Sequence, residues 1–327
     1  MINMDDNYSN ALSNLHFIDL FCGIGGFHLA LSSFGAKCVF ASDINQAACE
    51  VYQNNFHLIP KGDITKIHAK DIPAHEILCA GFPCQPFSIS GSQKGYDDER
   101  GKLFFDIIRI ANYHRPKIML LENVRNFEHH DGGNTLKKAI AELSKIGYIS
   151  FFKVLQASDY RIPQARNRIY IVAFRNDLGI SEFTFPVKCE NFRVLNDFLI
   201  DEQENQVPGN YLINRDYTLT LSDNGERSNQ LCRIGKIGLG RQGERIYSVL
   251  GQSITLSSQG GGLGGKTGMY LINDSVRKLY PRECARLMGF PDNFRLSSSQ
   301  EQNYRQFGNS VVVDVLQYII KEIVQIL

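Results

Sequence analysis

The first 175 residues of the chain alternate between short apolar runs and segments in which apolar residues recur at helical spacing. Helical patterns lie near residues 26–34, 45–55, 101–113 and 134–146. The apolar runs that predict strands are HFIDLF, KCVFAS, EILCAG, KIMLLENV, SFFKVLQA and RIYIVAFR. Strands that alternate with helices form a largely parallel sheet, and right-handed crossovers place helices on both of its faces. The sequence therefore predicts a doubly wound α/β domain with a mostly parallel sheet.

The composition changes after about residue 195, which indicates a second and smaller domain. Residues 209–268 contain 13 of the 28 glycines of the chain, with short β-like runs such as YTLTL and QSITLS between them. No helical period appears there, so we expect a small, irregular, β-rich domain. The predicted domains are a first domain of residues 1–195 together with 305–327, a small domain of residues 196–280, and a connecting region of residues 281–304.

The two segments that follow the glycine-rich region have helical patterns. RKLYPRECARLMGFPD looks helical from Pro281, and the chain ends in SVVVDVLQYIIKEIVQIL. In that tail Val312, Val315, Ile319 and Ile323 recur at helical spacing. They predict an amphipathic helix that returns to the core of the first domain. The tail also contains the charged residues Asp314, Lys321 and Glu322, which exclude a membrane span.

Composition and charge restrict the class of protein. The chain has 327 residues, of which 43% are hydrophobic and 21% charged, as in a globular protein with a sizeable core. The start MINMDDNYSN shows no apolar run behind a basic segment, and the eight cysteines contain no C-x-x-C pair, so we expect a cytoplasmic protein with reduced thiols and no metal. Residues 215–295 carry twelve Lys and Arg against seven Asp and Glu, although the net charge is only +1. This imbalance is typical either of an anionic partner that meets one face or of an ordinary solvated surface.

A glycine-rich turn, FIDLFCGIGGF, joins the first predicted strand to the first predicted helix. Gly23, Gly25 and Gly26 permit a tight turn and let a ligand approach the backbone at a helix start. Asp43 ends the second strand, 20 residues after Gly23, where an acidic side chain accepts hydrogen bonds from a ribose. The pattern indicates an adenosine-type cofactor. Because the spacing is not G-x-G-x-x-G, it argues against NAD.

Two polar residues follow predicted strands at their carboxyl ends, where open α/β sheets bind ligands. Cys84 lies in GFPCQPFSIS, and Glu122 begins ENV after the apolar run IMLL. Cys84 is interpreted as a nucleophile, a metal ligand, a redox thiol or a small apolar filler, and the cysteine spacing disfavours zinc and dithiol chemistry. Glu122 is either a partly desolvated acid suited to proton donation or a cap for a neighbouring element.

The order of FIDLFCGIGG, GFPCQPFSISG, ENV, QARNRIY, RECARLMGFPD and QFGNSV resembles the bacterial DNA cytosine-5 methyltransferases, in particular the HhaI type, over nearly the whole chain. The resemblance implies transfer of a methyl group from S-adenosylmethionine to carbon 5 of a cytosine flipped out of duplex DNA. It implies that Cys84 adds to ring carbon 6 and that Glu122 binds or protonates ring nitrogen 3. Arg168 would bond the carbonyl oxygen at ring position 2, with Arg166 in support. The other interpretation of both arginines is pairing with surface phosphates or carboxylates.

The same resemblance implies a set of cofactor-binding residues. Phe21, Gly23 and Gly25 would surround the methionine end of S-adenosylmethionine, Asp43 would bind its ribose, and Asp63 its adenine amine. The remaining members of the set are Ile44, Ile64, Pro83, Leu103, Asn309 and Val311. Ile44 departs from the HhaI type, which has an aromatic residue there to stack on adenine.

For DNA, the resemblance implies that Ser88, Ile89 and Ser90 touch the flipped nucleotide and the space that it leaves. Gln242 would fill that space, and Arg245 would read a guanine edge, the commonest specific base contact of arginine. The other DNA-binding residues that it implies are Arg100, Thr255 and Gln259. The expected target is GCGC, methylated on its inner cytosine. Gln259 replaces an aromatic residue of the HhaI type and could change the reading of one outer position.

Other functions share part of this pattern. A tRNA cytosine-5 methyltransferase has the same catalytic motifs, and a catalytically inactive DNA-binding relative would keep the second domain. A small-molecule methyltransferase would explain the cofactor turn but would leave the thiol and the second domain without a role. The resemblance favours double-stranded DNA as the partner, with no membrane contact and a monomeric protein. It also indicates the modification arm of a restriction-modification system, without a stable complex with the endonuclease.

Overall fold

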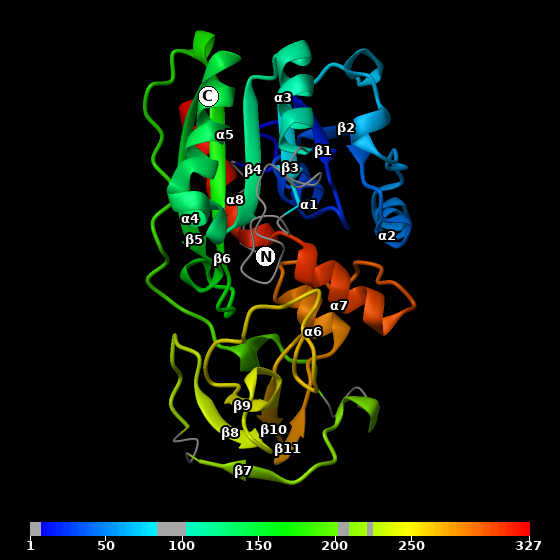
Figure 1. Ribbon diagram of the computed structural model, residues 1–327, viewed down its shortest axis with the longest axis vertical. Coiled ribbons are helices and arrows are strands. Elements are labelled where there is room, and N and C mark those ends of the chain that lie inside the picture. Colours follow the sequence, from blue (N-terminus) through cyan, green and yellow to red (C-terminus); the bar gives the residue numbers. More distant parts are fainter. Residues whose placement is uncertain (1–7, 84–102, 202–208, 221–224) are drawn as a thin grey trace. The chain divides into compact units, whose positions relative to one another are not determined.

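The computed structural model describes residues 8–83, 103–201, 209–220 and 225–327 (Figure 1). The chain forms two compact units. The larger unit contains residues 2–155, 167–187 and 315–327, and the smaller unit contains residues 156–166 and 188–314. Among the described residues, no helix is long and apolar enough to cross a membrane.

A six-stranded sheet in the order β2-β1-β3-β4-β6-β5 forms the centre of the larger unit. Neighbouring strands from β2 to β4 are parallel, whereas β6 is antiparallel to β4. The prediction of a mostly parallel sheet is therefore confirmed for one side of the sheet. The strands are β1 (His16–Leu20), β2 (Lys37–Ser42), β3 (Ile77–Gly81), β4 (Ile118–Val124), β5 (Tyr148–Gln156) and β6 (Asn167–Arg175).

The helices of this unit follow the predicted patterns with small shifts at their ends. They are α1 (Gly26–Ser32), α2 (Gln46–Phe56), α3 (Leu103–His114), α4 (Asn126–His129), α5 (Asn134–Lys145) and α8 (Val313–Ile326), of which α8 takes its first two residues from the smaller unit. Short 3₁₀ turns are η1 (Ile64–Lys66), η2 (Ala69–Asp71), η4 (His130–Gly133) and η6 (Asn176–Leu178). The Asn45 side chain caps α2 by accepting a hydrogen bond from the Ala48 N–H, at 3.1 Å.

Alternate residues of the strands divide the core into two faces. On one face Ile18, Leu78 and Leu121 pack in a single cluster with Phe104 of α3 and Leu136 of α5. Asp19 and Cys79 point to the opposite face and are also fully buried. The C-terminal helix α8 returns to this unit as predicted, since Val315, Ile319 and Ile323 are buried. Gln317 of α8 also donates to Ser33 at the end of α1, at 2.9 Å.

The smaller unit contains a five-stranded sheet in the order β11-β10-β9-β8-β7. Ile234, Ile246 and Met269 belong to its buried core. The strands are β7 (Tyr217–Leu219), β8 (Arg233–Ile237), β9 (Arg245–Ser248), β10 (Met269–Ile272) and β11 (Ser275–Arg277). Its helices and turns are α6 (Pro281–Arg286), α7 (Gln300–Asn309), η5 (Ala157–Tyr160), η7 (Leu195–Phe198), η8 (Gly209–Tyr211) and η9 (Gln242–Glu244). The expected β-rich character is confirmed.

The run QSITLS is not a strand of this sheet. It pairs with residues outside the sheet instead, because the Ser253 N–H donates to the Pro163 carbonyl at 2.7 Å and the Ala165 N–H donates to the Ser253 carbonyl at 2.9 Å. This leaves one isolated bridge between Gln164 and Ser253. The β-like pattern of this run therefore did not correspond to a strand of the sheet.

The compact units divide the chain differently from the predicted domains. Residues 281–304 belong to the smaller unit rather than to a separate connection, and residues 156–166 join the same unit. Side-chain bonds explain both differences. Fully buried Gln164 donates to the Leu287 carbonyl at 2.9 Å and accepts from the Leu256 N–H at 3.1 Å. Arg277 and Glu283 form a buried ion pair at 2.8 Å at the start of α6.

Candidate active site

The glycine-rich turn after β1 is held by the carboxylate of Asp43. One oxygen of Asp43 accepts a hydrogen bond from the Gly23 N–H at 2.9 Å, and the other accepts from the Asn45 N–H at 2.8 Å. The Cys22 N–H also donates to the Ser42 carbonyl, at 3.0 Å. Asp43 therefore joins the ends of β1 and β2. Each of its oxygens retains lone pairs for a further donor.

Three residues of this turn have positive φ values. Phe21 has φ 55°, Gly23 has φ 53° and Gly25 has φ 88°. For a phenylalanine this conformation is strained, and such strain gathers at functional sites. A Cβ atom at Gly25 would lie 2.2 Å from the Phe56 ring, so only glycine fits there. A Cβ at Gly23 would meet nothing within 4 Å, so the backbone of Gly23 borders open space.

Asp19 lies fully buried on β1 below this turn. Burial, reinforced by the nearby Asp43, holds the pKa of Asp19 well above its usual range. The pKa of Asp43 is raised as well, because its carboxyl is largely removed from water, while hydrogen bonds from Asn45 and Gly23 oppose the shift. The two backbone N–H groups that donate to Asp43 favour the ionised form of its carboxyl.

A third acidic residue, Asp63, caps the short turn η1. Its Oδ1 accepts hydrogen bonds from the Thr65 N–H at 3.0 Å and from the Thr65 hydroxyl at 2.7 Å. These bonds hold the pKa of Asp63 below its usual range, so the group is ionised near neutrality. Ile64, which follows it, is buried, whereas the side chain of Ile44 is 79% exposed. An exposed aliphatic face thus follows Asp43, where the HhaI type has an aromatic ring.

These residues fit an adenosine-containing ligand such as S-adenosylmethionine. The open space beside Gly23 admits a ligand, while Asp43 and Asp63 supply acceptors for hydroxyl and amine groups. The other predicted members of the set lie as follows: Pro83 and Leu103 are half-buried in the larger unit, and in the smaller unit Asn309 is exposed at the end of α7 while Val311 is buried.

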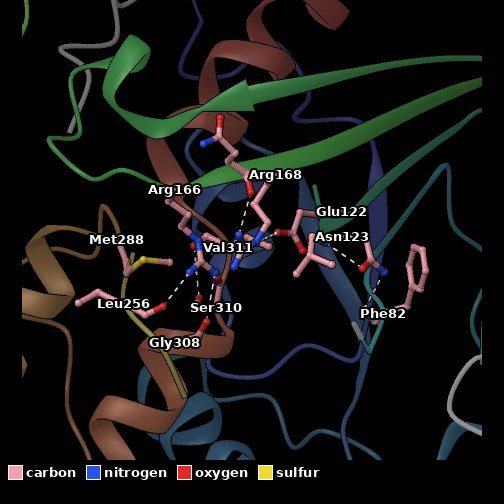
Figure 2. A network of polar contacts seen from close by, with 12 residues as sticks. Phe82, Glu122, Asn123, Arg166, Arg168, Leu256, Met288, Gly308, Ser310 and Val311 are labelled. Atoms are coloured by element: carbon pink, nitrogen blue, oxygen red, sulfur yellow. Dashed lines mark hydrogen bonds and ion pairs between the residues drawn. The ribbon is translucent and has the colours of Figure 1, made fainter. Parts of the chain in front are cut away.

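Glu122 and Arg168 form an ion pair at the carboxyl end of β4 (Figure 2). The Arg168 Nε lies 3.1 Å from the Glu122 Oε1, and both side chains are largely buried. The strand register explains the contact. Glu122 is opposite Tyr170 and Val124 is opposite Arg168, so the acid and the base are diagonal neighbours on one face.

The same register fixes where the proline–cysteine motif leaves the sheet. On its other side Glu122 is paired with Gly81 of β3, three residues before Cys84. Cys84 itself lies outside the described residues, as do the predicted DNA contacts Ser88, Ile89, Ser90 and Arg100. The described part of the chain thus brings the end of β3 beside Glu122 and Arg168.

Asn123 is a residue of this site that the sequence analysis missed. It is buried, its side-chain amide donates to the Phe82 carbonyl at 3.1 Å, and its Oδ1 accepts from the Val124 N–H at 2.9 Å (Figure 2). Asn123 therefore fixes the backbone just before Pro83. An amide in the middle of a buried run was the available signal, because a buried polar side chain needs partners.

Arg166 was expected to support the catalytic arginine or to pair at the surface. The surface alternative is wrong, since Arg166 is only 2% exposed. Its guanidinium donates to three backbone carbonyls, those of Leu256 at 3.2 Å, Gly308 at 3.2 Å and Ser310 at 2.5 Å (Figure 2). Within the smaller unit Arg166 thus holds the turn after α7, which contains Asn309 and Val311.

The predicted DNA-reading residues that the structure describes lie in the smaller unit. Gln242 is exposed on η9, and Arg245 begins β9. The Arg245 Nε is buried without a hydrogen-bond partner among the described residues. Thr255 donates its hydroxyl to the Ala165 carbonyl, and Gln259 is exposed.

Glycines connect these reading segments through their backbones. The Gly264 N–H donates to the Gly243 carbonyl at 2.9 Å, and a Cβ at Gly243 would lie 2.8 Å from the Gly261 carbonyl oxygen. The segment after Gln242 and the glycine run are therefore packed backbone against backbone.

Throughout the described ranges, no group of three or more His, Cys, Asp or Glu side chains is arranged to hold a metal ion.

The chain is similar to known proteins over nearly its whole length. A family model for C-5 cytosine-specific DNA methylase matches residues 15–325. The chain is 51% identical over 308 residues to the type II methyltransferase M.HhaI of Haemophilus parahaemolyticus, covering 94% of each chain. It is 36% identical to the type II methyltransferase M.HpaII of Haemophilus parainfluenzae, covering 97% of this chain and 91% of that one. The methyltransferase EhMeth of Entamoeba histolytica shares the fold, with a TM-score of 0.74 at 22% identity over 94% of this chain and 97% of that one.

Proposed function

The chain belongs to the C-5 cytosine-specific DNA methylase family and is a DNA cytosine-5 methyltransferase, and from this premise we propose that it methylates a flipped-out cytosine through a covalent bond to Cys84. One observation carries the proposal. The ion pair of Glu122 and Arg168 lies at the carboxyl end of β4, where β4 is paired with the end of β3 that leads to Cys84. The same end of the sheet thus carries an acid, Glu122, and a hydrogen-bond donor, Arg168. It also carries the end of the strand from which the chain continues to the nucleophile.

The chemistry of cytosine explains why these residue types are needed. Carbon 5 of the ring is too weak a nucleophile to accept a methyl group directly. Addition of the Cys84 thiolate to ring carbon 6 forms a sulfur–carbon bond and makes carbon 5 nucleophilic. S-adenosylmethionine supplies the methyl group. Loss of the proton from carbon 5 then restores the aromatic ring and expels Cys84 as a thiolate.

Glu122 and Arg168 would stabilise the charge that this addition creates on the ring. Glu122 delivers a proton or a hydrogen bond to ring nitrogen 3, and Arg168 donates to the oxygen at ring position 2. Their ion pair supports these roles, because it fixes the direction of both side chains before the base arrives. Arg166 donates to three backbone carbonyls, and we assign it as a positioning residue rather than a catalytic one.

For the cofactor, we assign the residues implied by the family resemblance. Phe21, Gly23 and Gly25 would border the methionine end, Asp43 the ribose hydroxyls and Asp63 the adenine amine. The exposed side chain of Ile44 would pack on the adenine face without aromatic stacking. The two lone-pair-bearing carboxylates, already held by backbone N–H groups or by Thr65, support this arrangement.

For the target, we propose GCGC in double-stranded DNA, with methylation of the inner cytosine. A base stacked inside a duplex is not accessible to an attacking thiol, so the nucleotide must be flipped out, at a cost of a few kcal/mol. Gln242 would fill the vacated space, and Arg245 would bond a guanine edge. The identity of 51% to M.HhaI over 94% of both chains supports this specificity, and Gln259 is where it could deviate.

The cellular role proposed is the modification arm of a type II restriction-modification system. The most similar relatives reported above are both type II methyltransferases. We propose that the enzyme acts in the cytoplasm as a monomer and forms no stable complex with a cognate endonuclease. The similarity to two type II methyltransferases supports this role, and the endonuclease would recognise the same DNA site independently.

The mechanism is tested by the variant Cys84→Ala, with Cys232→Ala as a control for the loss of another thiol. We expect Cys84→Ala to transfer no tritiated methyl groups to duplex DNA while DNA binding persists, and Cys232→Ala to remain active. Duplex containing 5-fluorocytosine should trap the wild-type enzyme covalently, because fluorine cannot leave as a cation in the final elimination. Turnover by Cys84→Ala, or labelling of tRNA in preference to DNA, would contradict the proposal.

Specificity is tested separately, by bisulfite sequencing of a plasmid treated with the purified enzyme. We expect methylation at the inner cytosine of GCGC. Methylation at a different motif would overturn the specificity assignment and leave the catalytic assignment intact, because the two rest on different residues. A consistent change at one outer position would implicate Gln259, since one wrong base pair typically costs about 1–3 kcal/mol.

A further inference from the structure

Arg109 on α3 holds the turn that carries the adenine-binding residues. Its Nη2 donates to the Ile64 carbonyl and its Nη1 to the Ile67 carbonyl, each at 3.0 Å. Asp106, one turn earlier on α3, accepts from the Nε at 3.1 Å and from the Nη2 at 3.0 Å. The guanidinium therefore connects two backbone carbonyls to one fixed carboxylate.

The turn that Arg109 holds is too short to be stable alone. The 3₁₀ turn η1 contains only Ile64–Lys66, and such short turns depend on partners for their terminal backbone groups. Asp63 caps the start of η1, and the Ile64 side chain is buried in the same core cluster as Phe104 of α3. The orientation of Asp63 and of the Ile64 backbone thus depends on how η1 is fixed to α3.

We propose that Arg109, oriented by Asp106, is a positioning residue that sets the preference of the cofactor site for adenine. The inference rests on the proposed function, in which the Asp63 carboxylate accepts from the adenine amine. Arg109 touches carbonyls and not the ligand, so its action is indirect. Without its two hydrogen bonds η1 would rotate or fray, and the Asp63 carboxylate would no longer lie opposite the amine.

The test compares two ligands that differ only at the purine edge. S-adenosylhomocysteine presents an amine to Asp63, whereas S-inosylhomocysteine presents a carbonyl that the carboxylate repels. The dissociation constant of S-inosylhomocysteine divided by that of S-adenosylhomocysteine reports the adenine preference. Both constants are measured by titration calorimetry on the full chain. We expect Arg109→Met to reduce that ratio by about tenfold, as the loss of charge-assisted hydrogen bonds predicts. Arg109→Lys should give an intermediate ratio, because one donor remains.

Arg175→Met is the matched control. Arg175 also bonds a nearby carboxylate, that of Asp177 at 2.6 and 2.9 Å, together with the Arg115 carbonyl, but it lies at the end of β6. We expect it to leave the ratio unchanged. Should Arg109→Met fail to fold, Asp106→Ala removes the partner that orients the guanidinium and is expected to lower the ratio in the same direction.

Failure of this inference and failure of the proposed function give different results. A wild-type enzyme that binds both ligands equally, or an Asp63→Ala variant that keeps the wild-type ratio, would overturn the adenine assignment itself. If Asp63→Ala loses the preference but folded Arg109→Met keeps it, only the role of Arg109 is overturned. An equal loss of both ligands in Arg109→Met would likewise overturn it, since that result describes a damaged pocket rather than a lost preference.

Discussion

The proposed catalytic and cofactor site of the larger unit differs from the proposed DNA-reading segments of the smaller unit, around Gln242 and Arg245, in how its polar side chains are bonded. In the larger unit Asp43, Asp63 and Glu122 are already bonded to groups of the protein. In the smaller unit the side chains of Gln242 and Arg245 form no hydrogen bond or ion pair with another described residue. The difference follows from what each site must do. Charge stabilisation in a reaction needs groups that are fixed in advance, whereas base reading needs donors and acceptors that are available to DNA.

In the smaller unit the proposed DNA-reading segments are held by backbone contacts instead. The hydrogen bond between Gly264 and Gly243, and the close approach of Gly260 to the carbonyl of Gly265, hold the reading segments without using their side chains. In the larger unit the side chains of Asp43 and Glu122 themselves connect separate strands. We therefore expect substitutions in the larger unit to change rate or cofactor affinity, and substitutions of reading side chains to change sequence discrimination.

The largest effect is expected at Glu122. Glu122→Gln keeps the shape of the side chain but removes its negative charge and its ability to transfer a proton, so single-turnover methylation should fall by ~10²–10⁴-fold. DNA affinity should remain nearly unchanged. Glu142→Gln, at a half-buried residue of α5 that pairs with Lys145, is the control. An unchanged single-turnover rate would show that Glu122 is only a structural partner of Arg168.

Most of the fold could be predicted from the sequence because the alternation of apolar runs reports burial directly. All six strands of the large sheet were expected at nearly their observed places. The antiparallel direction of β6 was not, since a pattern of apolar residues contains no information on strand direction. The interpretation of QSITLS as a β-like run was wrong for a related reason, because an extended segment need not belong to a sheet.

The parts of the site that rest on long-range contacts could not be predicted. Arg166 reaches carbonyls 90 to 144 residues away, and Arg109 bonds carbonyls 42 and 45 residues away. A backbone carbonyl has no sequence signature, so the sequence around Arg166 or Arg109 does not indicate such a partner. The motif residues Glu122 and Asp43 were identifiable because short sequence patterns mark the ends of strands.

The next largest effect is expected at Asp43. Asp43→Ala removes the acceptor that joins Gly23 and Asn45 and also the proposed ribose contact, so S-adenosylmethionine should bind more weakly by about 1.5–3 kcal/mol. Burial raises the pKa of Asp43, so protonation on acidification should weaken binding at a higher pH than for an ordinary aspartate. Titration calorimetry across pH tests both points. In Asp43→Asn the pH dependence should disappear.

Equal cofactor affinity in Asp43→Ala would show that the ribose assignment is wrong. If Asp43→Asn kept the full pH dependence, a different group would control it, and the raised pKa of Asp19 would make that residue the first to examine. Thermal unfolding of each variant serves as the control for loss of the glycine turn.

A smaller effect is expected at the reading segment, and it should be of a different kind. Arg245→Ala should lower the discrimination between GCGC and a site with one altered guanine by about 1–3 kcal/mol, while cofactor affinity stays constant. Arg227→Ala is the control, because that arginine of the same unit is already paired with Asp197, at 2.6 Å. Single-turnover rates on matched duplexes give the measurement. A loss of cofactor affinity without relaxed discrimination would break the division between the two units.

The smallest effect is expected at Ile44, which combines a place in the larger unit with an exposed side chain. Ile44 belongs to the larger unit, yet its side chain is 79% exposed, like the reading side chains of the smaller unit. Exposure means that Ile44→Trp should leave the free energy of unfolding nearly unchanged. An indole there would stack on adenine, which is worth about 0.5–1.5 kcal/mol beyond the area that it buries, so the cofactor should bind equally well or several-fold more tightly. Ile59→Trp, at a residue that is 61% exposed in the same unit, is the control and should have no effect. Weaker binding of S-adenosylmethionine by a folded Ile44→Trp variant would mean that the adenine does not pack on this side chain. The exposed face after Asp43 would then have to be reassigned.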